Sequence, residues 1–251
     1  MLKLGRIESG VARVQKHRED KNLYSAPDQL LRALARELKN PLILIARRSE
    51  LEKNASNGPQ AYETLQQTAE NALQLIDSYM LMAQSEYGQR SLPLETVGIG
   101  SVVYEVVRDL TPHTKVREID FATEVKAGDV MANREGLKAI IWCLCELMVA
   151  QNGDGGQIKK KVRIKTMKQD RKVSISVLSS DMDITNSDID AARRIQGMSH
   201  LAGGKLSDSG IRLAIADVLT SSLGSRLKVR KINGLKGLCF ELAGSRQLQL
   251  V

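Results

Sequence analysis

The feature that most constrains the fold of this chain is an amphipathic segment at residues 28–51. Asp28, a residue type that favours helix N-caps, opens it. Apolar residues then recur at spacings of three and four, which places one stripe along a helix: Leu31, Leu34, Leu38, Leu42 and Ile45. Pro41 lies inside the pattern, where a proline removes one backbone hydrogen bond and usually kinks a helix. The sequence therefore predicts a long, kinked helix with one apolar face.

A second amphipathic helix is predicted from Pro59 to about Tyr87, after a turn-like linker at residues 54–58. Its apolar stripe is Leu65, Ala69, Ala72, Ile76, Met80 and Ala83. Two such helices joined by a short loop form an antiparallel hairpin. One hairpin cannot bury both stripes, whereas two hairpins can do so as a four-helix bundle, so we expect a homodimer. Its seam would consist of Leu34, Leu38, Leu42 and Ile45 facing Leu65, Ala72, Ile76 and Met80.

Residues 91–251 have a different pattern, in which helices and strands alternate. The predicted helices lie at 99–110, 137–151 and 211–223, with a helical fragment at 191–195. The predicted strands lie at 118–125, 158–167, 172–178, 226–232 and 238–242, the last two joined by an Asn-Gly turn. We therefore predict an α+β protein with three segments. These are a lead-in at 1–26, a dimerisation hairpin at 27–90 and an α/β sandwich at 91–251.

The run from Arg36 to Leu42, RELKNPL, resembles the phosphorylation motif of bacterial sensor histidine kinases. In that motif a His is followed by Glu, Leu, a basic residue, a small polar residue, Pro and Leu. The order of elements in residues 91–251 is similar to the ATP-binding domain of the same family, so the resemblance covers about residues 28–244. Arg36 stands where the family has its phospho-accepting His. Arginine is always protonated and offers no lone pair, so it cannot act as that nucleophile.

The positions that bind nucleotide and magnesium in the family carry other residues here. In the predicted helix at 137–151, Leu147 takes the place of the metal-binding Asn and Cys143 that of an earlier Asn. Neither side chain is an oxygen ligand for magnesium. The adenine-binding Asp and three glycines of the later motifs are replaced by Ser179, Asp181, Asp183 and Arg212. The comparison with the family therefore predicts no catalytic residue, no bound cofactor and no metal site.

Composition limits the remaining functional classes. The net charge is +8, with basic runs at 159–172 and 226–231 that are typical of solvated strand faces. Because only 3% of residues are aromatic and no recognition motif is present, we do not expect a nucleic-acid partner. No apolar run has the length of a membrane span and no signal-peptide pattern is present, so a cytoplasmic protein is predicted. The three cysteines lack metal-ligand spacing, and the two in the apolar helix are predicted to be buried free thiols.

The resemblance implies a catalytically inactive, dimeric, histidine-kinase-like signalling protein, a pseudo-histidine-kinase that binds a response regulator or a partner kinase. We expect the partner to contact a row on the first helix that is separate from its apolar stripe: Arg36, Asn40, Ile43 and Arg47. A divergent active histidine kinase or phosphotransferase is the first alternative, and nucleotide binding discriminates between the two. A basic adaptor on nucleic acid is the second alternative, and salt-dependent binding would identify it.

Overall fold

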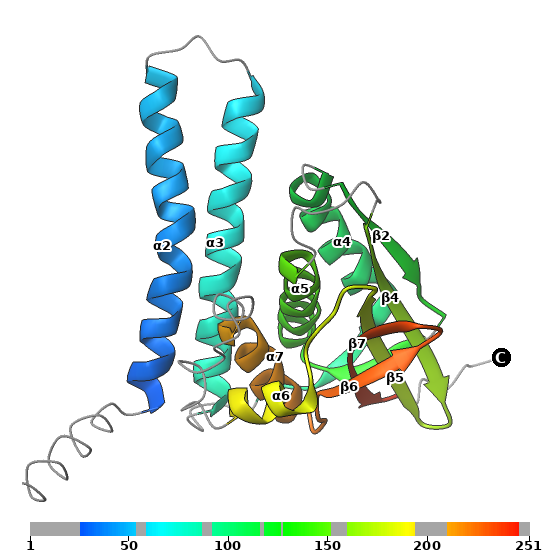
Figure 1. The fold of residues 1–251 in the computed structure, drawn as a ribbon. Coiled ribbons are helices and arrows are strands. Elements are labelled where there is room, and N and C mark those ends of the chain that lie inside the picture. Colours follow the sequence, from blue (N-terminus) through cyan, green and yellow to red (C-terminus); the bar gives the residue numbers. More distant parts are fainter. Residues whose placement is uncertain are drawn as a thin grey trace, which may run out of the picture.

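The computed structural model describes residues 26–53, 59–86, 92–115, 118–126, 128–151, 160–193 and 210–245. Apart from Ala26, the predicted lead-in at 1–26 lies outside the described residues, as does the linker at 54–58. Figure 1 shows a hairpin of two long helices beside a mixed α/β domain, with the second helix of the hairpin nearer to that domain. The predicted α+β class, with a helical hairpin followed by an α/β unit, is confirmed.

The hairpin consists of α2 (Ala26–Lys53) and α3 (Pro59–Glu86), and α2 continues through Pro41 without ending. On α2, Leu34 is buried and Leu38 packs against the same apolar core. The buried residues of α3 follow spacings of three, three and four, which is one face of a helix. They are Ala72, Leu75, Ser78 and Met82.

A five-stranded mixed sheet forms the back of the α/β domain. Its strand order is β2 (Ile119–Glu124), β4 (Lys160–Gln169), β5 (Lys172–Ser179), β7 (Leu235–Ala243) and β6 (Lys228–Ile232). The β2–β4 pair is parallel and the other pairs are antiparallel. Asn233 and Gly234 join β6 to β7 with positive φ angles of 50° and 82°, the conformation that an Asn-Gly hairpin turn requires. The predicted final hairpin is therefore confirmed.

A small second sheet pairs β1 (Glu95–Gly98) with β3 (Asp129–Ala132) in antiparallel fashion. The sequence analysis did not predict β3 as a strand, because its four residues run directly into the pattern of the following helix. The helices of the domain are α4 (Ile99–Lys115), α5 (Arg134–Gln151), α6 (Asn186–Arg193) and α7 (Gly210–Ser222).

Two helices differ from their predicted bounds for local reasons. α4 continues past Pro112 to Lys115, because a proline in the last turn removes only one hydrogen bond of a helix that is about to end. α6 begins before the predicted fragment at 191–195. The backbone N–H of Thr185 donates a hydrogen bond to Asp188 Oδ2 at 2.7 Å, which is a capping interaction that starts the helix at Asn186.

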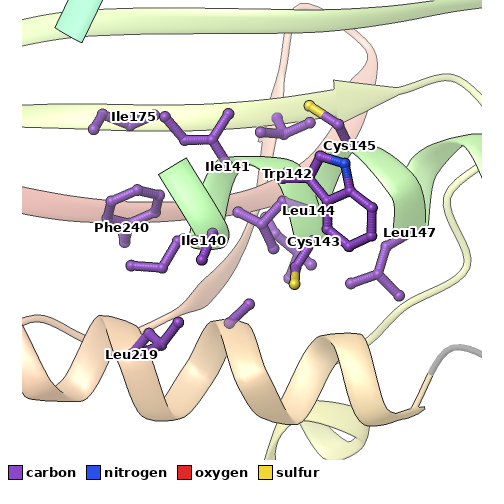
Figure 2. Close-up of a cluster of buried hydrophobic side chains, with 14 of the residues drawn as sticks. Ile140, Ile141, Trp142, Cys143, Leu144, Cys145, Leu147, Ile175, Leu219 and Phe240 are labelled. Carbon is purple, nitrogen blue, oxygen red and sulfur yellow. The ribbon is translucent and has the colours of Figure 1, made fainter. Parts of the chain in front are cut away.

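The core is built around α5, in which every residue from Leu137 to Val149 is buried except Lys138. One side of α5 packs on β4 and β5, and α7 packs on another side. Figure 2 shows this arrangement, with Ile140, Ile141 and Leu144 between the strand residues Ile175 and Phe240 and the α7 residue Leu219. α3 then packs against both α5 and α7, so the hairpin lies on the helical side of the α/β domain, away from the sheet.

Candidate functional site

The predicted partner row lies along one side of α2. Asn40, Ile43 and Arg47 are exposed, and Ile43 has an exposed fraction of 38%. The backbone of Arg36 continues the same row one turn earlier in the helix. The structure therefore keeps these positions on one helix face, which is separate from the face that carries Leu34.

Glu37, the residue after Arg36, points in another direction and forms a contact between the two parts of the molecule. Its Oε2 accepts a contact at 3.0 Å from Nη1 of Arg212 in the first turn of α7. The side chains of Glu37 and Arg212 are only 11% and 17% exposed. The sequence analysis treated Arg212 as a replaced glycine and did not pair it with Glu37, because nothing in the local pattern relates positions so far apart in the chain.

Arg212 is held among aromatic and acidic groups from two other helices, α5 and α2. Its guanidinium lies 5.9 Å from the ring centroid of Trp142 on α5, within the range of a cation–π contact. Burial alone would lower the pKa of Arg212, but the charges of Glu146 and Glu37 outweigh it and raise the pKa above its ordinary value. Glu146 lies on α5 and is 7% exposed. Arg212 therefore stays charged beside the Glu37 carboxylate of the hairpin.

The two positions that correspond to the family's Asn residues lie inside the core. Cys143 and Leu147 both have an exposed fraction of 0%. Burial raises the pKa of the Cys143 thiol to about 12, so this thiol is neutral near pH 7. All three cysteines are free and buried, as the sequence analysis predicted for the two in α5. Neither Cys143 nor Leu147 offers an oxygen ligand, so a magnesium ion would need other groups.

The acidic loop after β5 is separate from the contact at Arg212. Ser179 is buried at the end of β5, whereas Asp181 and Asp183 are exposed. Met182 and Ile184 alternate with them and are buried, which anchors the loop to the core. The described part of the chain contains no group of three or more His, Cys, Asp or Glu side chains arranged to hold a metal ion.

A cleft of about 460 Å³ lies between α3, α4 and α5. Trp142 lines it from α5, Asp109 and Arg108 line it from α4, and polar side chains such as Gln67 and Asp77 line it from α3. Gln67 donates a hydrogen bond from Nε2 to the carbonyl oxygen of Asp109 at 3.3 Å, which links the hairpin to α4. Trp142 thus belongs both to this cleft and to the surroundings of Arg212.

The predicted dimer seam is divided in the structure. Leu34 and Ala72 are 6% and 8% exposed within the single chain, so they cannot form a surface for a second copy. Leu42 and Met80, in contrast, are 59% and 53% exposed. The reason for the difference is tertiary: α2 and α3 pack against each other and both pack against α7, so part of each stripe is already covered within the chain.

Comparison with known proteins gives a likeness in fold and none in sequence. No protein-family model and no curated protein matches the chain. The structure is similar to histidine kinase AdeS of Acinetobacter baumannii, with a TM-score of 0.54 and 12% identity over 84% of this chain and 98% of that one. It is also similar to full-length ShkA in complex with AMPPNP, with a TM-score of 0.51 and 19% identity over 87% of this chain and 46% of that one.

A third similar structure is histidine kinase ThkA in complex with the response regulator TrrA, with a TM-score of 0.51 and 16% identity. That match covers 93% of this chain and 66% of ThkA, so the chain spans about two thirds of ThkA and less than half of ShkA. The chain thus has the fold of a histidine kinase catalytic core, as the sequence analysis expected. In the described residues no helix is both long and apolar enough to cross a membrane.

The same comparison corrects the prediction that the chain is not an enzyme. The solved structures that share its fold are histidine kinases, which are enzymes. The prediction of a pseudo-histidine-kinase was drawn from single replaced positions such as Arg36 and Leu147. The prediction is therefore wrong on this finding and is not retained.

Proposed function

We propose that this chain is a signalling protein on the histidine-kinase fold, which pairs with a second copy through its helical hairpin and binds a response regulator on α2. The observation that carries the proposal is the location of exposed apolar side chains. Of the seven large apolar side chains that are exposed in the described residues, five lie on the hairpin: Leu42, Ile43, Leu44, Leu73 and Met80. A concentration of exposed apolar side chains on two neighbouring helices favours an interaction site.

Pairing of two hairpins is supported by the exposed residues of α3. Leu73 is 58% exposed and Met80 is 53% exposed, and Ile76 lies between them with partial exposure. Their spacings of three and four place them on one face, distinct from the buried face that contains Leu75 and Met82. α3 therefore has one apolar face covered by its own chain and a second that a partner hairpin can cover.

Binding of a response regulator is supported by the row on α2. Asn40 and Arg47 supply polar and positively charged groups beside the apolar Ile43, and Arg36 adds a further positive charge in sequence. An acidic pocket on the partner would gain charge-assisted hydrogen bonds from such a row. ThkA, which shares the fold, was solved in complex with a response regulator.

The test of the partner surface uses the intact chain as bait and identifies the response regulators that it retains. The double variant Arg36→Glu with Ile43→Asp should then lose most of that binding, measured by calorimetry on the purified pair. The control is Arg171→Glu with Tyr104→Asp, which makes the same two kinds of change at exposed positions on the α/β domain. Equal binding by both double variants, or retention of no response regulator by the wild type, would contradict the proposal.

A second candidate function is that of a divergent kinase or phosphotransferase. The shared fold favours it, and ShkA with this fold was solved with AMPPNP. An arginine at position 36 has no lone pair for phosphate, so this function requires another acceptor group, in this chain or in its partner. Calorimetry with ATP and magnesium, followed by incubation with labelled ATP and the identified response regulator, tests it. Nucleotide binding together with label on either protein would favour the enzyme.

A further inference from the structure

We infer that Arg212 is a reversible clamp that holds α2 against the α/β domain by pairing with Glu37, and that Glu146 is its alternative partner when α2 moves away. The first observation is the position of the three groups. Arg212 on α7 contacts Glu37 on α2 at 3.0 Å, and its pKa is also raised by Glu146 on α5. Trp142, which is one turn before Glu146 on α5, lies 5.9 Å from the Arg212 guanidinium, so Glu146 is on the side of α5 that faces this cation.

A buried ion pair with only two members is costly to separate, because each charge is left without a partner in a poorly solvated place. The presence of Glu146 changes this, since Arg212 keeps a carboxylate nearby after Glu37 has left. Among the described residues, Oε1 of Glu146 has no hydrogen-bond partner, so it has the capacity to accept one from Arg212. Glu37, which is on the helix that moves, would become solvated as an ordinary surface carboxylate.

The two helices of the hairpin are attached to the domain in different ways. α3 is attached by apolar side chains, with Leu75 and Met82 only 2% and 0% exposed. These contacts do not depend on charge. α2 is attached by the apolar side chains of Leu34 and Leu38 at two places and, between them in sequence, by the Glu37–Arg212 contact. Breaking the ion pair should therefore loosen α2 around Glu37 while α3 stays in place.

The backbone of α2 is weakest at the same residue. Pro41 has no N–H, so the carbonyl of Glu37, four residues earlier, lacks its usual helical donor. A helix bends most easily at such a position. Glu37 is therefore both the residue whose side chain the clamp holds and the point at which α2 can bend. A movement at Glu37 would then shift the exposed residues of α2 on either side of it.

The experiment measures distances between spin labels in the full chain. Labels at Ala35→Cys on α2 and Glu135→Cys on α5 report on the clamp, and labels at Gln84→Cys on α3 and Glu135→Cys serve as the control; all three positions are exposed. The native cysteines are buried, and burial raises the pKa of each of their thiols, so they should not react with the label.

We expect a narrow distance distribution for both label pairs in the wild type. Glu37→Gln and Arg212→Met should broaden and lengthen the distribution from position 35 and leave that from position 84 unchanged. Glu146→Gln should leave both narrow, because it removes only the alternative partner. If the distance distribution from position 35 is unchanged in Glu37→Gln, the clamp is wrong. If Glu146→Gln broadens that distribution as much as Glu37→Gln does, both carboxylates hold Arg212 at the same time, and the proposed exchange of Arg212 between them is wrong.

Thermal unfolding gives a second test that does not depend on labels. If each carboxylate substitutes for the other, the loss of melting temperature in Glu37→Gln combined with Glu146→Gln should exceed the sum of the two single losses. Additive losses would contradict the exchange of partners. If the double variant does not fold while both single variants do, that outcome also supports it, since Arg212 then has neither carboxylate.

Discussion

The guanidinium of Arg193 on α6 forms a bidentate ion pair with the carboxylate of Asp217 on α7. Nη2 donates to Oδ1 at 2.9 Å and Nε donates to Oδ2 at 3.0 Å. The side chain of Asp217 is 5% exposed, whereas that of Arg193 is 37% exposed. The hydrogen bond with Asp217 is the main reason why the pKa of Arg193 is raised. A bidentate pair of this kind adds a directional contact to the apolar packing of Ile189 and Ala192, which anchor the short helix α6 in the core.

Arg193→Ala should therefore destabilise the protein by about 1–3 kcal/mol, since it leaves a buried carboxylate without its donor while the lost cation was partly solvated. Urea unfolding at pH 7 measures the change. Arg171→Ala, at an exposed arginine on the β4–β5 turn, is the matched control and should change stability by less than about 0.5 kcal/mol. Equal effects of the two variants would show that the Arg193–Asp217 pair contributes nothing.

Leu147 should not tolerate asparagine, the residue that the resemblance to histidine kinases implies at this position. Its side chain has an exposed fraction of 0% in the centre of the apolar core. Leu147→Asn both removes apolar volume and buries an amide, so we expect a loss of roughly 3–5 kcal/mol in the free energy of unfolding. Leu147→Met keeps the volume and should cost less than about 1.5 kcal/mol. A well-folded asparagine variant of unchanged stability would mean that this position is open to a polar ligand.

Glu105 should make part of the stability depend on pH. Its carboxylate accepts contacts from Lys138 Nζ at 2.6 Å and from Arg134 Nη2 at 2.9 Å. The hydrogen bond from Lys138 is the largest cause that lowers the pKa of Glu105 below its ordinary value of 4.5. Because the folded pKa is the lower one, the stabilisation is fully present above pH 4.5 and is lost as the pH falls through the folded pKa.

Glu105→Gln should thus reduce the free energy of unfolding on the order of 1 kcal/mol at about pH 7, and this difference from the wild type should shrink toward about pH 3. Chemical unfolding at the two pH values measures both differences. Glu95→Gln, at an exposed carboxylate on β1, is the control and should show little difference at either pH. A difference that does not change with pH would exclude the ionised carboxylate as its source.

The oligomeric state should depend on the exposed face of α3. Light scattering of the wild type at micromolar concentration should give twice the chain mass of 27.7 kDa. Leu73→Asp combined with Met80→Asp should give the mass of one chain, because two charges would be buried in the paired hairpins. Tyr104→Asp, at a side chain on α4 that is 69% exposed, should leave the mass unchanged. A monomeric wild type would contradict the pairing.

Elements with a strong local signal were predicted correctly from the sequence. The apolar periodicities located α2 and α3, and α5 was recognised from its continuous apolar run. The turn at Asn233 and Gly234 followed from backbone chemistry that acts within two residues. The errors were also local: the strand β3 is too short to show a period, and the capping contact of Thr185 with Asp188 was overlooked. The sequence also shows directly which residues differ from the histidine-kinase motifs, namely Arg36, Ser179, Asp181, Asp183 and Arg212. The prediction drawn from them, that the chain is not an enzyme, was not supported.

The sequence by itself determined which helix faces are apolar, because side-chain direction in a helix is set by the 3.6-residue period. Only the tertiary structure decided what covers each face. Leu34 and Ala72 carry the same periodic signal as Leu42 and Met80, yet the packing within the hairpin and against the α/β domain buries the first two and leaves the others in water. The pairing of Glu37 with Arg212 has the same origin, since a contact between helices so far apart in the chain depends on how the two parts dock and leaves no period or motif in the sequence.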